Sequence, residues 1–311
     1  MAVGNQFNTF KYEPWVSILI NNYNYGHLIG AAIDSGLNQT YPHTEVIVVD
    51  DGSTDNSREI IKSYGERIIP VLKENGGQAS AFNAGFTASR GDIICLLDSD
   101  DIFLPHKLAE VVNIFRGYQD INWCFHSLKL VDIKTNAFVK SSHEGSSQEC
   151  DFRTHIKRGK RPFSPPATSG LCFTRSLLQM MLPMPEAKHI SIGDHYLKFT
   201  ALALSKGFFM GKDLAIQNLH SNNAYTLRDD NQQIKARIFI LTAYWIRVKF
   251  PFLARFTNKL VAKGIALYYR TGKFEIEHNK IISSYISLVG LLEKVEISIE
   301  TLFYYLFYSK T

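Results

Sequence analysis

Three aspartates stand within four positions in the stretch Leu96-Leu97-Asp98-Ser99-Asp100-Asp101. They directly follow the apolar run 92–97, which has the pattern of a buried strand. Carboxylates this close repel one another and need a compensating cation. Hard divalent cations prefer oxygen ligands and usually keep substrate phosphates in their coordination shell. The cluster therefore predicts a site for a metal and a diphosphate, and the alternative is a solvated acidic turn.

A second acidic pair, Asp50 and Asp51, follows the apolar run 45–49. The next residues, 52–55, read Gly-Ser-Thr-Asp and have the composition of a turn that caps a helix. Capping explains Ser53, Thr54 and Asp55 but does not require the two preceding aspartates. Their carboxylates could accept hydrogen bonds from the base or ribose of a nucleotide.

These acidic residues need a framework, and the first hundred residues supply one. Strand-like apolar runs at 16–20, 45–49, 68–72 and 92–97 alternate with helical patterns. This alternation predicts an α/β fold with a mainly parallel, Rossmann-like sheet covered by helices on both faces. Such sheets bind ligands beyond the carboxyl ends of their strands. We therefore expect residues 21–24, 50–51 and 98–101 to converge on one crevice.

The remainder of the chain is more mixed. Between 102 and 230 the patterns predict helices at 105–115, 175–181 and 195–204, strands at 122–133, 137–140, 170–173 and 208–219, and a long surface loop at 141–165. From about 231 the sequence is helical in pattern. We expect a catalytic domain over 1–230, with a nucleotide-binding half at about 15–101 and an acceptor half at about 102–230, and a helical extension over 231–311.

Composition favours an ordered globular protein. The 311 residues are 45% apolar and 20% charged, which is ordinary for a folded domain. The four cysteines, at 95, 124, 150 and 172, include no CxxC pair, so we interpret them as small buried side chains in a reducing compartment. Neither a secretory signal nor a run of about 18 apolar residues is visible. These features predict a cytoplasmic protein.

Positive charge gathers at the end of the chain. Residues 235–310 hold 12 Lys or Arg and 5 Asp or Glu, whereas the whole chain carries only +5. The extension also has an apolar stripe at helical spacing, which includes Ile238, Leu241 and Trp245. Two interpretations stay open: helices packed on the catalytic domain, or a surface that contacts an anionic membrane. We find no nucleic-acid-binding motif.

Several motifs, taken in order, carry a family resemblance: VSILINNYNYG from 16, EVIVVDDGSTDNS from 45, ENGGQASAFNAG from 74 and RGDIICLLDSDD from 90, then GDHYLKF from 193 and LHSNNAYT from 219. As a set they resemble glycosyltransferase family 2, over roughly residues 15–225. The resemblance implies a GT-A fold, an inverting and non-processive reaction, and a nucleotide-sugar donor, with UDP as the expected nucleotide. The chain has no QxxRW motif of processive synthases.

The resemblance also assigns residues to the donor. Tyr23 would pack on the nucleotide base and Asp51 would bind the base edge. The set expected to bind or support the donor is Asn21, Tyr23, Asp50, Asp51, Gly76, Gly77, Gln78, Asn83, Asp98 and Ser99. The chain departs from the family at two of these regions: many relatives have Pro where Asn21 stands and Arg where Phe82 stands, so one polar contact is missing.

The remaining assignments concern the reaction itself. Asp98 and Asp100 would form the DxD pair, with Asp100 as the ligand of Mg²⁺ or Mn²⁺, Asp98 nearer the ribose, and Asp101 supporting them. Relatives commonly carry Glu-Asp before a helix, and here Gly193-Asp194 stands in that place. Asp194 would be the general base that takes the proton of the acceptor hydroxyl. The alternative is a helix cap. His220 would be a further metal ligand.

Together these features predict an inverting glycosyltransferase that acts on a saccharide or lipid-linked acceptor, in cell-surface polysaccharide or glycolipid biosynthesis. A sugar-phosphate nucleotidyltransferase is the first alternative, although such enzymes have a Gly- and Lys/Arg-rich loop after the first strand and 21–26 has no basic residue. A non-catalytic protein that binds nucleotide sugars is the second. Intact Asp98, Asp100 and Asp194 argue against it.

Overall fold

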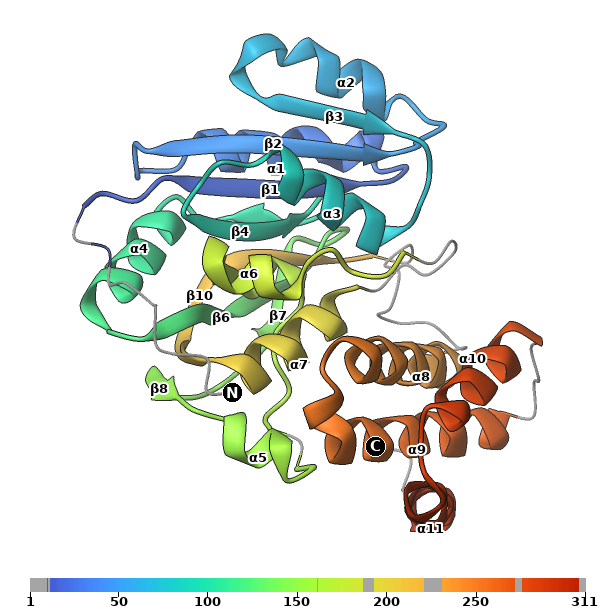
Figure 1. Cartoon of the computed structure of the whole chain (residues 1–311). Coiled ribbons are helices and arrows are strands. Elements are labelled where there is room, and N and C mark those ends of the chain that lie inside the picture. The colour runs from blue at the N-terminus through green and yellow to red at the C-terminus, as the bar shows by residue number, and fades with distance from the viewer. Residues whose placement is uncertain are drawn as a thin grey trace. The chain divides into compact units, whose positions relative to one another are not determined.

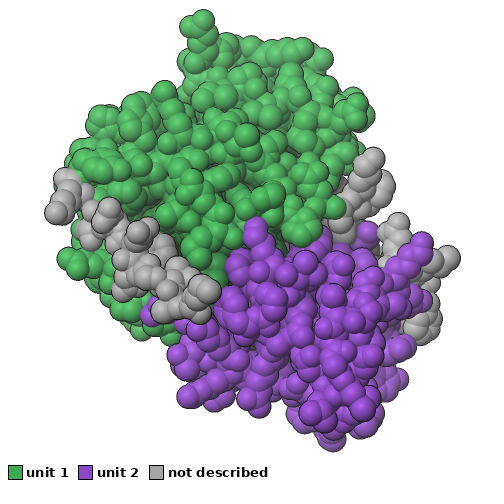
Figure 2. Space-filling model, in the orientation of Figure 1, with its two compact units in different colours: residues 1–151, 164–220 green, residues 152–163, 221–311 purple. Residues whose placement is uncertain are grey.

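The computed structural model describes residues 10, 12–160, 162–186, 193–220, 231–271 and 276–307 (Figure 1). The chain divides into two compact units (Figure 2). Unit 1 comprises residues 1–151 and 164–220, and unit 2 comprises residues 152–163 and 221–311. The segment 152–163 therefore groups with the C-terminal helices, although it lies in the middle of the region for which we expected a continuous catalytic domain.

Unit 1 is built on one sheet. Its ten strands, in chain order, are β1 Val16–Asn22, β2 Thr44–Asp51, β3 Ile69–Lys73, β4 Ile93–Asp98, β5 Ile102–Phe103, β6 Ile121–Asp132, β7 Ala137–Ser141, β8 Gln148–Cys150, β9 Leu171–Thr174 and β10 Lys206–Leu219. The strand order is β3-β2-β1-β4-β9-β6-β10-β5, with β7 beside β6 and β8 beside β10. The first four strands in this order are parallel, as expected. Beyond β4 most pairs are antiparallel, and β6 with β10 is the parallel exception.

Helices cover both faces of the parallel part. The helices of unit 1 are α1 Gly26–Leu37, α2 Ser57–Ser63, α3 Gln78–Ala88, α4 Lys107–Gly117, α6 Arg175–Met181 and α7 Asp194–Leu204, with short 3-10 turns η1 Gly65–Arg67 and η2 Thr168–Gly170. Successive residues of a strand point to opposite faces. Ile18 of β1 meets Gly36 of α1, whereas Leu19 meets Gly85 of α3. A Cβ at Gly85 would lie 2.7 Å from Leu19, so only glycine lets α3 approach this closely.

The apolar runs that predicted strands form the core. Residues Ile18, Val48 and Leu97, from the three central parallel strands, are all fully buried. The four cysteines are also buried and unbridged, as expected from their apolar surroundings. Cys172 of β9 lies opposite Cys95 of β4 and Cys124 of β6. These side chains are part of the packed interior.

The prediction of a single long loop over 141–165 is wrong in part. β8 pairs with β10, and the short helix α5 Arg153–Lys157 belongs to unit 2. Sequence patterns miss both because they are three and five residues long, too short for a periodic signal.

Unit 2 is helical, as the periodicity after 231 predicts. Besides α5 it contains α8 Asn231–Lys249, the 3-10 turn η3 Pro251–Leu253, α9 Ala254–Thr271, α10 Ile276–Ser287 and α11 Leu291–Phe307. Helix α9 is central: it packs against α8 and α11, and most of its residues are buried. Among the helices described, none is both long enough and apolar enough to cross a membrane.

Candidate active site

The carboxyl ends of three parallel strands bring the predicted acidic residues together. In the β1–β4 pair Asn21 lies beside Asp98, and in the β1–β2 pair Asn22 lies beside Asp50. Three segments separated by almost 80 positions in the chain thus meet at one edge of the sheet. This convergence was expected from the strand pattern, and the register confirms it.

Asp50 is fully buried at this edge of the sheet. Its carboxylate accepts hydrogen bonds from Asn22 Nδ2 at 3.0 Å, from Arg58 Nε at 2.7 Å and from the Ser53 backbone N–H at 3.1 Å. Burial alone would raise the pKa of Asp50, but the hydrogen bonds from Ser53, Arg58 and Asn22 hold the pKa below its usual value. Asp50 therefore fixes the loop after β2 and has no exposed surface to offer a ligand.

Asp51 faces the loop that leads into α3. Its Oδ1 accepts from Lys73 Nζ at 2.6 Å and from the Gly76 N–H at 3.0 Å, and its Oδ2 accepts from the Gly77 N–H at 2.8 Å. Gly77 adopts a left-handed φ of 84°, which favours glycine and starts the helix. Among the described residues Oδ2 accepts one hydrogen bond, so it could accept another from a ligand.

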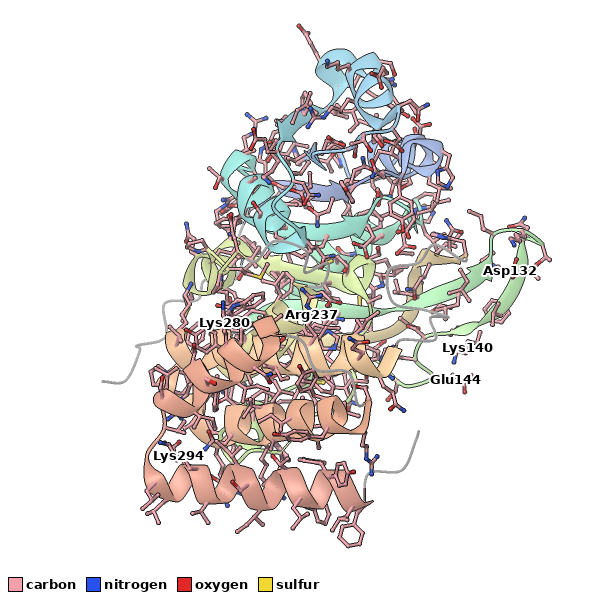
Figure 3. All side chains as sticks on the ribbon, turned by 90° about the vertical axis from the view of Figure 1, so that its right-hand side faces the viewer. Asp132, Lys140, Glu144, Arg237, Lys280 and Lys294 are labelled. Carbon is pink, nitrogen blue, oxygen red and sulfur yellow. The ribbon has the colours of Figure 1, made fainter. Side chains whose placement is uncertain are left out.

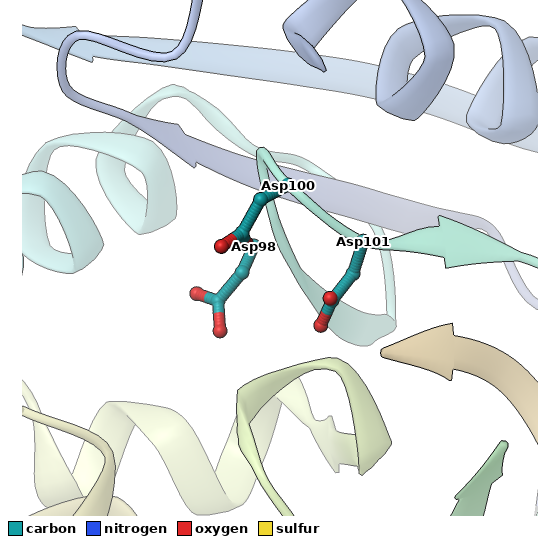
Figure 4. A group of neighbouring side chains, drawn as sticks. All are labelled: Asp98, Asp100 and Asp101. Carbon is teal, nitrogen blue, oxygen red and sulfur yellow. The ribbon is translucent and has the colours of Figure 1, made fainter. Parts of the chain in front are cut away.

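The DxD region forms a compact acidic group at the end of β4 (Figure 4). Asp98, Asp100 and Asp101 place carboxylate oxygens within 4.8 Å of one another. Asp101 is committed to the protein: its Oδ2 accepts from Ser169 Oγ at 2.6 Å and its Oδ1 from the Asn218 N–H at 3.1 Å. Asp101 therefore holds the turn in place, whereas Asp98 has a hydrogen bond with the side chain of Thr168 and Asp100 lies beside His220.

His220, the residue after β10, lies beside this acidic group. Its Nε2 lies 3.1 Å from Asp100 Oδ2. The ring of Tyr25, which sequence reasoning did not single out, packs edge-on against His220, with 5.7 Å between ring centroids. Burial and the charges of Asp100, Asp98 and Asp101 raise the pKa of Tyr25, so its hydroxyl stays protonated beside the cluster. The expected continuation of this motif, 221–226, lies outside the described residues.

The charges of this group fit a divalent cation. Burial, together with the charges of Asp100 and Asp194, raises the pKa of Asp98 to about 8, because a further negative charge is unfavourable there. Carboxylate oxygens suit Mg²⁺ or Mn²⁺, and the imidazole of His220 could supply one further ligand. The residues that would hold such an ion are Asp100 and His220, with Asp98 next to them.

Asp194 begins α7 and lies within electrostatic reach of Asp98. Its Oδ1 is 3.0 Å from His195 Nδ1, and its Oδ2 accepts a short hydrogen bond from Lys198. Burial alone would raise the pKa of Asp194, but the charges of Lys198 and His195 hold it well below its usual value. The sequence analysis missed both partners, although a lysine four positions after an aspartate on a helix is a recognisable pair.

Two amides from α3 anchor the segment around Asp194. Gln78 Oε1 accepts from the Gly193 N–H at 2.6 Å. Asn83 donates to the Met184 carbonyl and accepts from the Met184 N–H, both at 2.8 Å, and also donates to Glu186. Both residues were expected to bind the donor. The structure instead shows them joining α3 to the segments on either side of 187–192, which lies outside the described residues.

The last three expected donor residues lie around the end of β1 and within the acidic turn. Asn21 has a buried side-chain amide whose nitrogen and oxygen find no partner in the described part of the chain. Buried amides are normally hydrogen-bonded, so this one is suited to a ligand. Tyr23 is 48% exposed, which leaves its ring accessible for stacking. Ser99 is buried between the two DxD aspartates.

Comparison with known proteins identifies the family. Residues 17–174, half of the chain, match the family described as Glycosyl transferase family 2. The chain belongs to glycosyltransferase family 2. A protein named as an uncharacterized glycosyltransferase, from Nostoc sp. strain PCC 7120, is 34% identical to this family 2 chain over 212 residues, which cover 67% of the chain and 66% of the relative. One from Rickettsia typhi is 39% identical over 45% of each protein.

Solved structures agree on the fold. TarS of S. aureus, residues 1–349 in complex with UDP-GlcNAc, superposes with a TM-score of 0.64 and 17% identity, covering 94% of this chain and 89% of TarS. The mannosyltransferase PcManGT of Pyrobaculum calidifontis, in complex with GDP-Man and Mn²⁺, gives a TM-score of 0.52 and 15% identity, covering 96% and 89%. At such identities the similarity concerns the fold alone, and it confirms the expected GT-A architecture.

Proposed function

We propose that this family 2 chain transfers a sugar from a nucleotide diphosphate-sugar to an acceptor hydroxyl, with inversion and with the help of Mg²⁺ or Mn²⁺. The observation that carries the proposal is the convergence of Asp98, Asp100, His220 and Asp194 at one edge of the sheet. A divalent cation held there would neutralise the diphosphate leaving group. UDP is the preferred nucleotide because TarS, which shares the fold, binds UDP-GlcNAc.

The proposed role of each residue follows from its position. Asn21, Tyr23 and Asp51 border the end of β1 and β2, where a nucleoside would lie. Asp98 and Asp100, with Ser99 between them, would hold the ribose and the diphosphate. Asp194 would take the proton of the acceptor hydroxyl. Its lowered pKa keeps it ionised, and so able to accept a proton, at neutral pH.

The names of the relatives indicate a general class of biosynthetic pathway. Over 95 residues the chain is 47% identical to the chondroitin synthase and the hyaluronan synthase of Pasteurella multocida, which are much longer proteins. Both names describe polysaccharide synthesis. We infer a role in the synthesis of a cell-surface polysaccharide or glycolipid, with a saccharide or lipid-linked acceptor.

The test is a screen of nucleotide sugars for thermal stabilisation that requires added Mn²⁺, followed by an assay of donor hydrolysis. Asp100→Ala is expected to abolish the metal-dependent stabilisation. Asp194→Asn is expected to keep it and to lose about 10²- to 10⁴-fold in turnover. A matched control is Asp132→Asn in the β6–β7 hairpin, labelled in Figure 3, which should change neither.

Three outcomes would contradict parts of the proposal. If Asp100→Ala binds metal and donor like the wild type, the metal assignment is wrong. Full transfer by Asp194→Asn would place the base elsewhere. Donor binding without any hydrolysis or transfer would favour the non-catalytic alternative, which a screen of acceptors would then confirm or exclude.

A further inference from the structure

The outer face of α11 carries a large apolar surface. Nine large apolar side chains of this 17-residue helix are at least 44% exposed, and Leu292 reaches 86%. At about 150–200 Å² for a fully exposed large side chain, these fractions amount to roughly 900 Å². The largest apolar patch on a typical monomer covers about 300–600 Å². The apolar surface of α11 is therefore larger than the largest apolar patch on a typical soluble monomer.

The opposite face of α11 holds the helix firmly within unit 2. Ile297 is buried, and Glu293 and Glu300 form ion pairs with Arg247 and Lys259, both at 3.0 Å. The acidic residues of α11 thus point inward, toward α8 and α9. The outer face is held in a fixed orientation and carries almost no charge.

The exposed residues follow a seam with alternating spacings of three and four. The seam is formed by Leu292, Val295, Ile299, Leu302 and Leu306. This 3-4 spacing is the heptad pattern with which one helix packs along another in a coiled coil. A helix that lies on an anionic lipid surface is expected to carry basic residues that flank its apolar face.

The sequence of the seam is self-complementary. Two copies of α11 can run antiparallel about a two-fold axis that crosses the outer face at the level of residue 297. Leu292 then meets Leu302 of the second copy, and Val295 meets Ile299. Each layer then joins residues of similar size, and the β-branched pair lies at the centre. Closed two-fold symmetry requires this kind of match, because each copy offers the same surface.

We propose that α11 forms an antiparallel two-helix interface with a second copy of this chain. The apolar face offers roughly 900 Å² per copy, of which the five seam residues supply about 500–600 Å²; the seam with its flanking residues is comparable to the about 800 Å² per partner of a standard stable interface. The near absence of charge fits a second copy as the partner, because two identical charged faces would repel each other. Lys294, labelled in Figure 3, is the one basic residue among the exposed side chains described on α11. That favours a second copy over an anionic membrane, where several basic residues are expected.

The first experiment measures the mass of the full chain in solution over a range of concentrations. The wild type is expected to be a dimer, and Ile299→Glu a monomer whose dissociation constant is raised by at least about 100-fold, because a two-fold interface contains the change twice. The control is Phe138→Glu on β7, which is equally exposed but lies in unit 1. It should remain dimeric. Ile299 is 63% exposed, so its replacement should not prevent folding.

The second experiment tests the direction of the helices. Leu292→Cys and Leu302→Cys lie about 15 Å apart along one helix at 1.5 Å per residue. A short thiol cross-linker should join a mixture of the two variants and neither variant to itself. The native cysteines 95, 124, 150 and 172 are buried, so they give little background.

The possible results separate clearly. A wild type that stays monomeric at all concentrations overturns the proposal. So does a monomer that binds anionic vesicles through this face and loses that binding in Ile299→Glu, because lipid would then be the partner. Cross-linking of each cysteine variant to itself overturns the antiparallel arrangement. A dimer that persists in Ile299→Glu places the interface elsewhere.

Discussion

Replacing Lys198 with methionine should move the acid limb of the pH–rate profile. Lys198 donates to Asp194 at the start of α7, and both side chains are almost inaccessible to solvent. The wild-type carboxylate has a pKa well below its ordinary 3.8, so it stays ionised throughout the practical assay range. Methionine has a similar length and removes the charge. The pKa of Asp194 then rises, because burial is left to act against the charged form.

The size of the expected change in the pKa of Asp194 follows from its ion pair with Lys198. An adjacent cation lowers the pKa of an aspartate by about 1–3 units, so losing Lys198 should raise it by about 2. That corresponds to about 2.7 kcal/mol between the two protonation states. Because a general base must be ionised, turnover by Lys198→Met should begin to fall at a higher pH than turnover by the wild type, which shows no such loss from this group in the assay range.

The assay is initial transfer or donor hydrolysis at saturating metal between pH 4 and 8. Lys206→Met is the matched control, because Lys206 pairs with Glu149 at a more exposed position of unit 1. Its profile should follow the wild type. The reasoning is refuted if Lys198→Met is folded and its profile coincides with that of the wild type. Asp194 would then not be the titrating base.

Stability provides an internal check on this variant. Breaking a buried ion pair by removing one partner typically costs about 3–5 kcal/mol, since the other charge is left buried. The double variant Lys198→Met, Asp194→Asn should recover part of this loss in urea unfolding, because neither charge remains. A double variant as unstable as the sum of the two single variants would show that the pair is not coupled.

Three further predictions rest on single contacts. Gln78→Ala should lower kcat about 10-fold, with the KM for the donor unchanged, if its bond to Gly193 positions the base; a changed KM would instead mean donor contact. Asn83→Ala should lower the free energy of unfolding by about 1–3 kcal/mol in urea, and a neutral result would contradict its anchoring role. Asp50 has a lowered pKa, so its stabilisation is present above its usual pKa and lost as the pH falls. Asp50→Asn should therefore flatten the dependence of stability on pH between about 2 and 5, which thermal unfolding would measure.

The sequence was a good guide to the framework of the site. Continuous apolar runs predicted β1, β2 and β4, since strands buried on both faces need such runs, and a shorter run predicted the largely exposed edge strand β3. The acidic residues that follow them lie together because parallel strands end at one edge. The antiparallel half was predicted only in part: β5 and β8 were missed, and the pairing of β9 and of β10 with β6 depends on long-range register that no local pattern encodes.

The roles within the site were harder to predict. Asp50 and Asp51 are adjacent and alike in sequence, yet Asp50 is sealed by Arg58 and Asp51 borders the α3 loop. Alternation along the strand turns neighbours to opposite sides, and only the packed structure shows which side holds a ligand. Asn83 was assigned to the donor because it matches the family pattern, and in the structure its amide is hydrogen-bonded to the backbone of Met184.

The electrostatics of the site suggest why its two kinds of carboxylate differ. Asp98 has a raised pKa because it is buried and because Asp100 and Asp194 lie near it, whereas the pKa of Asp194 is lowered by the charges of Lys198 and His195. Groups whose environments push their pKa values apart are suited to different tasks. Lys198 and His195 keep Asp194 charged, as the proposed role of proton acceptor requires. A cation bound beside Asp98 would favour its charged form, so under the proposed function we expect the acidic turn to bind the cation before the diphosphate.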